Sequence, residues 1–182
     1  MPRKRSRVRI SSPADFPRRN LTRDDPMKIS VISIGEVKNK NTIPIEKEYI
    51  KRLTPYFRIS IQEISVKKLS TLPEKQRKEK ECDIIRQKIK AGDFLILLDE
   101  GGKTYDSLKF ASMLKKHMLE STKQIVFAVG GVYGWDEDFK KEANAVLSLS
   151  SLTFTYELAR LILIEQIYRA TTIINRIPYH KE

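Results

Sequence analysis

The sequence predicts an α/β fold, with a mainly parallel sheet and helices on both of its faces. Five short apolar segments alternate along the chain with segments whose apolar residues recur at helical spacing, a pattern typical of parallel sheets. Two of the apolar segments, Phe94 to Leu98 and Ile125 to Val129, contain no polar residue, as expected for central strands covered on both faces. A length of 182 residues fits one domain with a sizeable core.

The first half of the domain is expected to begin with a strand at residues 28–34, which ends at Gly35. Residues 42–53 place apolar side chains at helical spacing and stop before a proline. Residues 58–66 alternate isoleucine with polar residues and predict a second strand. Residues 73–90 begin at a proline and are rich in Lys, Arg and Glu, which predicts a solvated helix. The alternative interpretation of this helix is a surface that faces phosphates.

The chain then enters the predicted centre of the sheet. Residues 94–98 form a third strand, and we expect Asp99 to Lys103 to be a loop at its carboxyl end. Asp106 or Ser107 suits the N-cap of the helix that follows. His117 lies near the end of this helix and is predicted to be structural rather than catalytic.

Residues 125–129 form a fourth strand, which leads into the Gly-rich turn VGGVYGW. Asp136 caps a short predicted helix, and residues 145–149 form the last strand. The last three strands should end at the same edge of the sheet, where open α/β sheets bind ligands. Glycines there let a ligand approach the backbone, and the segment LSLSSLTFT offers small hydroxyl groups.

Residues 156–176 predict the last and longest helix, with a core stripe on one side. The opposite side carries polar side chains that two apolar ones interrupt: Arg160, Glu165, Tyr168, Arg169, Thr171 and Thr172, with Leu161 and Ile164 between them. Glu165 and Arg169 have the spacing and order of a helical ion pair. Because this side is not simply polar, we expect a second copy of the chain to cover part of it in a homodimer.

An aromatic and basic tail follows Pro178, which ends the helix. Tyr179, His180 and Lys181 combine a ring, an imidazole and an ammonium group in three consecutive residues. This combination suits contact with a nucleotide. A disordered terminus is the alternative interpretation.

The composition limits the function classes. A formal net charge of +12 indicates a polyanionic partner such as RNA. The single cysteine excludes an internal disulfide, and with only two histidines a metal site is not expected. No apolar run is long enough to span a bilayer, and the N-terminus lacks the apolar centre of a signal peptide. We therefore expect a cytoplasmic protein that uses no metal and no membrane.

Residues 1–26 differ from the rest of the chain. They carry eight Lys or Arg against three Asp, and they show no hydrophobic periodicity. We predict that this segment is disordered. A start codon assigned upstream of Met27 explains it as a non-native extension, and an arm that grips RNA is the alternative.

The order and spacing of four motifs resemble a known family. The series VGGVYGW, LSLSSLTFT, LIEQIYRA and the closing PYHKE is similar to the RlmH-type SPOUT methyltransferases. The resemblance covers residues 27–182, and each motif alone is weak. It implies a SPOUT fold with a deep C-terminal trefoil knot, and methylation of N3 of a pseudouridine in bacterial large-subunit (23S) ribosomal RNA, free or within the assembled ribosome.

The resemblance also implies a cofactor, S-adenosyl-L-methionine, and a set of residues that bind it. These residues follow the ends of the last three strands: Leu98, Gly130, Leu149, Ser150, Ser151, Leu152, Thr153 and Phe154. The turn GGVYG follows a late strand rather than the first, which does not match a classical Rossmann methyltransferase. A phosphate loop is not supported either, because the chain contains no Gly-Lys-Ser or Gly-Lys-Thr.

The tail and the last helix are assigned the chemistry, as hypotheses. The imide nitrogen of a uracil-like base is protonated at neutral pH, so its methylation needs a base or a nearby positive charge. His180 is assigned as the proton acceptor, because the free imidazole pKa of about 6.5 suits this role. Arg169 stabilises charge on the base or grips a phosphate, and Glu165 orients it. Three residues complete the RNA-facing set: Tyr179 as a stacking ring, and Lys181 and Arg160 as RNA contacts.

One departure from the family and two alternatives remain. Thr155-Tyr156 stands where the family usually has Pro-His, which predicts a looser entry into the last helix. A non-catalytic, ribosome-associated RNA-binding protein is the first alternative, supported by charge alone. A flavodoxin-like binder of small nucleotides is the second, and it predicts phosphate-dependent binding without RNA.

Overall fold

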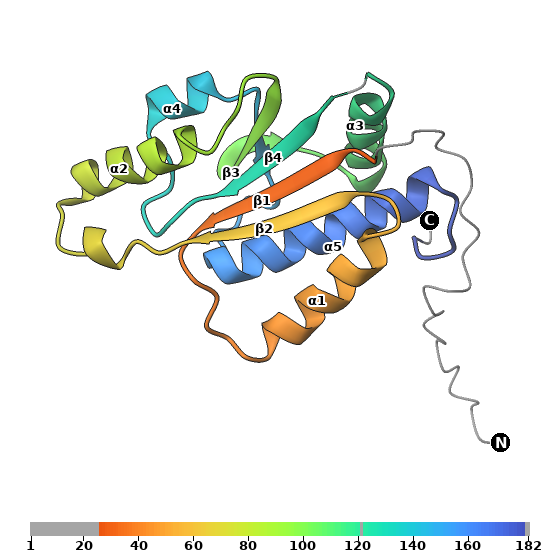
Figure 1. Cartoon of the computed structure of the whole chain (residues 1–182), viewed down its shortest axis with the longest axis horizontal. Helices are drawn as coiled ribbons and strands as arrows, with labels where there is room; N and C mark the ends of the chain where they lie inside the picture. The colour runs from red at the N-terminus through yellow and green to blue at the C-terminus, as the bar shows by residue number, and fades with distance from the viewer. Residues whose placement is uncertain (1–25, 121, 181–182) are drawn as a thin grey trace.

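The computed structural model describes residues 26–120 and 122–180, and their strands form one parallel sheet in the order β2-β1-β4-β3-β5 (Figure 1). The strands are β1 (Lys28–Ile34), β2 (Arg58–Ile64), β3 (Asp93–Thr104), β4 (Gln124–Val129) and β5 (Ala145–Ser148). The predicted parallel sheet is therefore confirmed. The predictions for residues 1–25 and for Lys181 lie outside the described residues.

Helices cover both faces of this sheet, as predicted (Figure 1). Three of them pack on one face: α1 (Thr42–Leu53), α3 (Ser107–Leu119) and α5 (Tyr156–Ile174). The other face carries α2 (Glu74–Arg86) and α4 (Glu137–Glu142). Alpha helix α5 runs beneath the sheet beside α1, from the carboxyl ends of the strands back towards their amino ends.

Alternation along the central strands produces two separate cores. In β4, Ile125, Phe127 and Val129 point to the core beneath α1, α3 and α5, whereas Val126 and Ala128 point to the core beneath α2 and α4. Side chains alternate between faces at a period of two, so a wholly apolar strand supplies both cores.

Two helix starts are fixed by side-chain caps. Asp106, rather than Ser107, caps α3 by accepting a hydrogen bond from the Lys109 backbone N–H at 2.7 Å. Asp136 caps α4 by accepting from the Asp138 N–H at 2.9 Å. Both aspartates thus satisfy amide groups that have no partner within the helix.

One predicted loop is wrong. Strand β3 does not stop at Leu98 but continues to Thr104, and its register against β5 shifts between Leu98 and Lys103. Gly102 lies so close to β5 that a Cβ atom there would be 2.8 Å from the backbone of Val146. The extension of β3 includes this close backbone contact with β5. A local pattern of apolar residues does not predict such a contact. The structure also contains a short 3-10 helix, Lys67–Leu69.

Within residues 26–120 and 122–180, no helix is both long and apolar enough to cross a membrane. The same residues contain no group of three or more His, Cys, Asp or Glu side chains arranged to hold a metal ion.

Candidate active site

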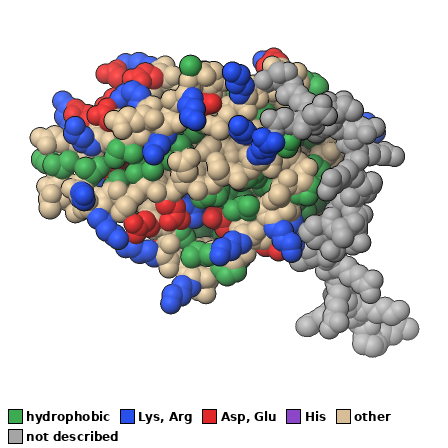
Figure 2. All heavy atoms as spheres, in the orientation of Figure 1, with side chains coloured by type: hydrophobic (Ala, Val, Ile, Leu, Met, Phe, Trp, Pro, Cys, Tyr) green, Lys and Arg blue, Asp and Glu red, His purple; other side chains and the backbone are tan. Residues whose placement is uncertain are grey.

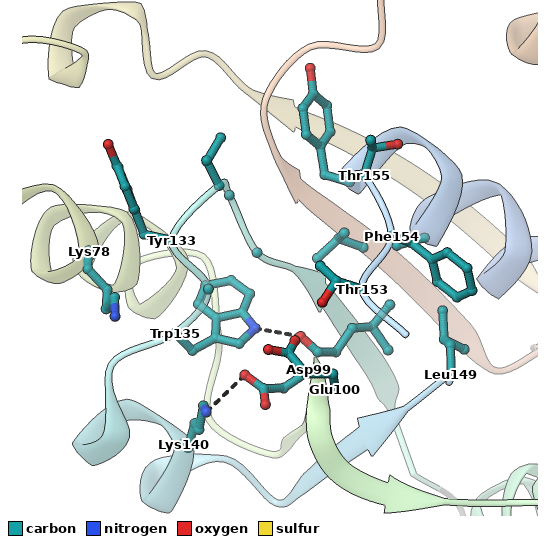
Figure 3. A pocket seen from close by; sticks show the side chains of 18 of the residues that line it. Lys78, Asp99, Glu100, Tyr133, Trp135, Lys140, Leu149, Thr153, Phe154 and Thr155 are labelled. Carbon is teal, nitrogen blue, oxygen red and sulfur yellow. Dashed lines mark hydrogen bonds and ion pairs between the residues drawn. The ribbon is translucent and has the colours of Figure 1, made fainter. Parts of the chain in front are cut away.

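A cavity of about 850 Å³ opens at the carboxyl edge of the sheet, beyond the ends of β4, β5 and the regular part of β3 (Figure 3). Its volume is in the range of small-molecule sites, and its place is the one where parallel sheets bind ligands. Of the eight residues predicted to bind a cofactor, Ser151 is the one that is not in the lining. The other seven line the cavity: Leu98, Gly130, Leu149, Ser150, Leu152, Thr153 and Phe154.

Trp135 joins two walls of this cavity. Its indole N–H donates a hydrogen bond to the Leu98 carbonyl oxygen at 2.9 Å, and its side chain is buried. This bond ties the Gly-rich turn after β4 to the end of the apolar run of β3 (Figure 3). The sequence prediction treated Trp135 only as the end of a turn.

Charged groups line the side of the cavity next to α4. The Lys140 ammonium lies 2.9 Å from a carboxylate oxygen of Asp99, and Asp99 also accepts a hydrogen bond from the Gly101 N–H at 3.0 Å. Burial lowers the pKa of Lys140, but its contacts with Asp99 and Glu137 outweigh this effect, so the net pKa is raised and the amine stays charged. Asp99 directly follows the buried apolar run of β3, which is a usable sequence signal, whereas Lys140 in a short helix carries none.

The segment between β5 and α5 is fixed by local bonds. The Leu152 N–H donates to the Ser150 hydroxyl oxygen at 2.9 Å, and Thr155 caps α5 by accepting from the Leu158 N–H at 3.4 Å. The Tyr156 hydroxyl donates to the Glu36 carbonyl oxygen at 2.9 Å. The looser entry at Thr155-Tyr156 stays a prediction, although one residue caps the helix and the other bonds to the chain just after β1.

Gly35 makes room for this tie. A Cβ atom at Gly35 would lie 2.9 Å from the Tyr156 ring. The φ angle of Gly35 is +111°, a value that residues other than glycine rarely adopt. Burial raises the pKa of Tyr156, and the neighbouring Glu157 acts in the same direction. Its hydroxyl therefore stays protonated and continues to donate.

Arg160 does not lie on an RNA-facing surface, so its predicted role is wrong. The residue is only 2% exposed, and its guanidinium makes two bonds to Glu46, at 2.7 and 3.0 Å. It also donates to Glu63 at 2.8 Å and to the Ser33 hydroxyl at 3.2 Å. Arg160 thus joins α5 to α1, β1 and β2 under the first turns of the helix.

The C-terminal tail folds back on α5. The Tyr179 hydroxyl donates to Glu165 at 2.9 Å and lies 3.3 Å from the Tyr49 hydroxyl. Arg169 donates to the same Glu165 oxygen at 2.6 Å and lies over the Tyr179 ring, 4.9 Å from its centre. Burial raises the pKa of Tyr179 well above its usual value, and the bonds to Tyr49 and Glu165 add to this. The predicted ion pair of Glu165 with Arg169 is present.

The cavity and the tail lie on different stretches of α5 in one chain. Tyr156 lines the cavity, and the tail contacts α5 at Glu165 and Arg169, which lie about 14 and 20 Å further along the helix at 1.5 Å per residue. His180 follows the tail turn and is half-buried, with no hydrogen-bond partner for its Nδ1 among the described residues. The predicted catalytic residues therefore gather in one cluster, but not at the cavity of their own chain.

Comparisons with known proteins identify the family of this chain. Residues 27–180 match the family model described as "Predicted SPOUT methyltransferase". The chain belongs to the SPOUT methyltransferase family. The predicted resemblance to RlmH-type members is confirmed by relatives that carry the name "Ribosomal RNA large subunit methyltransferase H".

Three such relatives show how far the similarity extends. The one from Parabacteroides distasonis is 44% identical over 157 residues, which are 86% of this chain and 100% of the relative. The one from Flavobacterium psychrophilum is 42% identical over the same shares. The one from Dictyoglomus thermophilum is 42% identical over 154 residues, 85% of this chain and 99% of the relative.

Charged side chains of both signs are mixed on the surface of this SPOUT methyltransferase. Figure 2 shows Lys and Arg side chains scattered over one face, with groups of Asp and Glu between them rather than a single basic field.

His117 is buried. Its Nδ1 lies 3.0 Å from the Thr122 hydroxyl, and its ring packs on Phe94 with ring centres 4.1 Å apart. The structure thus places His117 in packing contacts away from the cavity at the carboxyl edge.

Proposed function

We propose that this chain is an S-adenosyl-L-methionine-dependent methyltransferase that methylates N3 of a pseudouridine in large-subunit ribosomal RNA, in the cytoplasm. The observation that carries the proposal is the cavity at the carboxyl edge, which gathers three separate chain segments that the family resemblance had assigned to the cofactor. The names of the relatives supply the substrate class.

The charges around the cavity suit this cofactor. S-adenosylmethionine carries a sulfonium, an ammonium and a carboxylate group, so its net charge is positive. Four carboxylates line the cavity against two lysines: Glu74, Asp99, Glu100 and Glu137 against Lys78 and Lys140. This surplus attracts a cation and repels a phosphate group, so it disfavours the flavodoxin-like alternative.

The remaining lining suits the adenosine part. Gly130 offers backbone groups at close range, Ser150 and Thr153 offer hydroxyls, and Phe154 offers an aromatic ring. When bound, S-adenosylmethionine supplies an electrophilic methyl group. The residues of this chain hold that group at the carboxyl edge and limit its contact with water.

The acceptor side of the reaction is assigned to the tail. His180 accepts the proton of the base nitrogen, and Arg169 stabilises negative charge on the base. Glu165 positions both Arg169 and Tyr179 through a single carboxylate oxygen. None of these residues lines the cavity of the same chain, and Glu165 lies about 14 Å along α5 from Tyr156, so we assign the cluster to the cavity of a second copy.

A homodimer would bring the tail of one copy to the cavity of the other. If two copies pair through the outer sides of α5 in antiparallel orientation, the tail of each lies next to the cavity of the other. The side of α5 that faces away from the core suits this pairing, because Leu158 is 44% exposed and Leu161 and Ile162 are only half-buried, whereas Ile164, predicted on this side, lies in the core. The proposed active site is thus shared between the two copies.

The proposal includes the C-terminal trefoil knot implied by the family. The segment after β5 and the turn after β4 contribute to the same cavity, so threading would hold both in place without a ligand. Knots are nearly absent from proteins, and the family membership is the reason to propose one.

Transfer of labelled methyl groups to ribosomal RNA tests the function. The RNA is offered free, as ribosomal subunits and as assembled ribosomes, and calorimetry measures the affinity for S-adenosylmethionine. We expect cofactor binding and incorporation of label into large-subunit RNA. RNA binding without any cofactor affinity would instead support the non-catalytic alternative.

A further inference from the structure

Exposed apolar side chains stand on the rim of the cavity in two places. Leu152, beside the start of α5, is 72% exposed. Val132 and Tyr133, in the turn after β4 and beside α2, are 77% and 39% exposed. Exposed apolar groups around a binding cavity indicate a surface that a larger partner covers.

The Tyr133 ring is supported from behind by α2. The Arg77 guanidinium lies over this ring, 5.3 Å from its centre. Arg77 is held in turn by Glu81, whose carboxylate accepts from the Arg77 Nε–H at 2.8 Å and is fully buried. Arg77 therefore stays in place under the ring at the edge of the cavity (Figure 3 shows Tyr133 beside Lys78 of α2).

The backbone of the same turn also rests on Glu81. The second carboxylate oxygen of Glu81 is buried without a hydrogen-bond partner, and a Cβ atom at Gly131 would lie 2.5 Å from it. The turn is closed by a hydrogen bond from the Gly134 N–H to the Gly131 carbonyl oxygen at 3.2 Å. Glu81 thus holds the guanidinium and packs close to the turn, so the Tyr133 ring is supported from the α2 side.

We propose that Tyr133, backed by Arg77, is a stacking platform for a base of the RNA substrate next to the nucleotide that is methylated. This inference rests on the proposed function and adds an RNA-binding site that lies apart from the tail. Aromatic rings with a guanidinium partner bind exposed RNA bases by stacking.

Two other occupants fit this rim less well. A second copy that pairs through α5 packs on the face of the sheet opposite α2, and only its tail reaches the cavity, so Tyr133 on the α2 side stays accessible. The adenine ring of the cofactor belongs deeper in the cavity, because cofactor sites bury most of their ligand, whereas Tyr133 and Val132 stand on the exposed rim. An RNA base reaches the rim from solvent.

The test compares four variants of the full chain: Tyr133→Phe, Tyr133→Leu, Tyr133→Ala and Arg77→Lys. Binding to assembled ribosomes and to labelled large-subunit ribosomal RNA is measured without cofactor, and affinity for S-adenosylmethionine is measured by calorimetry. We expect Tyr133→Ala and Tyr133→Leu to weaken RNA binding about five- to 150-fold, the range for one stacked base. Tyr133→Phe keeps the ring and should bind as the wild type does. Arg77→Lys keeps the charge beside Glu81 but loses the planar group, so it should give an intermediate loss.

Each alternative outcome has a distinct meaning. RNA binding by Tyr133→Ala equal to that of the wild type overturns the platform and leaves the methyltransferase proposal intact. Retained binding in Tyr133→Leu shows that apolar cover, not stacking, is what matters. A fall in cofactor affinity assigns the ring to the cofactor instead. If the wild type binds neither ribosomes nor RNA and transfers no methyl group, both proposals fail together.

Discussion

The two edges of the sheet are built in opposite ways. At the carboxyl edge, three chain segments diverge around a cavity of about 850 Å³ and leave charged groups along its walls. At the amino edge, side chains pack more closely: Tyr179 packs against Tyr168 with ring centres 4.9 Å apart, and His117 packs against Phe94 beside a smaller cavity of about 520 Å³. The carboxyl edge, which has the larger cavity, is the open edge, and the amino edge, where these aromatic rings pack, is the closed edge.

This difference separates two functions within one chain. The open edge is complete in a single copy, because Trp135, Thr155 and Tyr156 hold its walls together through bonds inside the chain. The closed edge carries Arg169 and Tyr179, the groups assigned to the RNA base. Both donate a hydrogen bond to Glu165. Cofactor binding should therefore survive changes that remove methyl transfer.

Deletion of residues 178–182 should have the largest effect. Loss of the proposed proton acceptor and stacking ring is expected to lower the rate of methyl transfer by about a thousandfold or more, within the range for general acid–base groups. The affinity for S-adenosylmethionine, measured by calorimetry, should change less than about twofold because the cavity lies at the other edge. Full activity in the truncated chain would refute the role of the tail.

Mixing two inactive variants shows whether the tail acts on its own chain or on a partner. Thr153→Trp places a large side chain at an exposed position in the cavity lining and should abolish cofactor binding. Refolded mixtures with the truncated chain should recover about a quarter of the wild-type activity, because half of the dimers are mixed and each has one complete site. A mixture that stays inactive would contradict a shared active site.

Two arginines on α5 test how the open edge is held. Arg160→Met leaves Glu46 buried without its partner and should lower the free energy of unfolding by about 3–5 kcal/mol. Arg169→Met is the matched control, because the Arg169 side chain is 27% exposed and its loss should cost less than about 1 kcal/mol. Urea denaturation measures both. The double change Arg160→Met with Glu46→Leu should recover most of the stability, and equal losses in the two single variants would contradict the distinction.

The same two arginines show what sequence reasoning can reach. Arg160 and Arg169 occur on one helix and look equivalent in the sequence. Arg160, however, is buried and bonds to carboxylates that lie 97 and 114 residues away in the chain. Such partners cannot be inferred from local pattern. The ion pair of Arg169 with Glu165 could be predicted, because its four-residue spacing is local.

The same distinction between local patterns and distant contacts applies to the fold and to the cavity. The strands and helices follow from apolar periodicity, and the cofactor segments follow from strand ends together with the family resemblance. The extension of β3 was missed because residues 99–104 carry no strand pattern and pair through backbone groups. Lys140 and the Arg77 support of Tyr133 were missed because each depends on which helix packs beside the turn.

Neutralising one acid at the open edge should have a smaller effect. Glu100→Gln removes an exposed negative charge from the cavity lining and should weaken S-adenosylmethionine binding about two- to fourfold through lost long-range attraction. S-adenosylhomocysteine lacks the sulfonium charge, so its affinity should change less. Glu120→Gln removes the same charge at the closed edge and serves as the control. Equal weakening for both ligands would contradict an electrostatic role.

Acidification of the closed edge should have the smallest effect. Burial lowers the pKa of His117, Glu120 acts to raise it and Lys116 to lower it, with a net lowering below the usual value of about 6.5. The unfolded chain then takes up a proton more readily than the native chain, so the contribution of His117 to stability is present above about pH 6.5 and is lost as the pH falls. His117→Phe keeps a ring against Phe94 and removes the titration. Unfolding free energies measured between pH 7.5 and 5.5 should therefore fall less steeply in this variant, and parallel curves would show that the closed edge does not sense protons through His117.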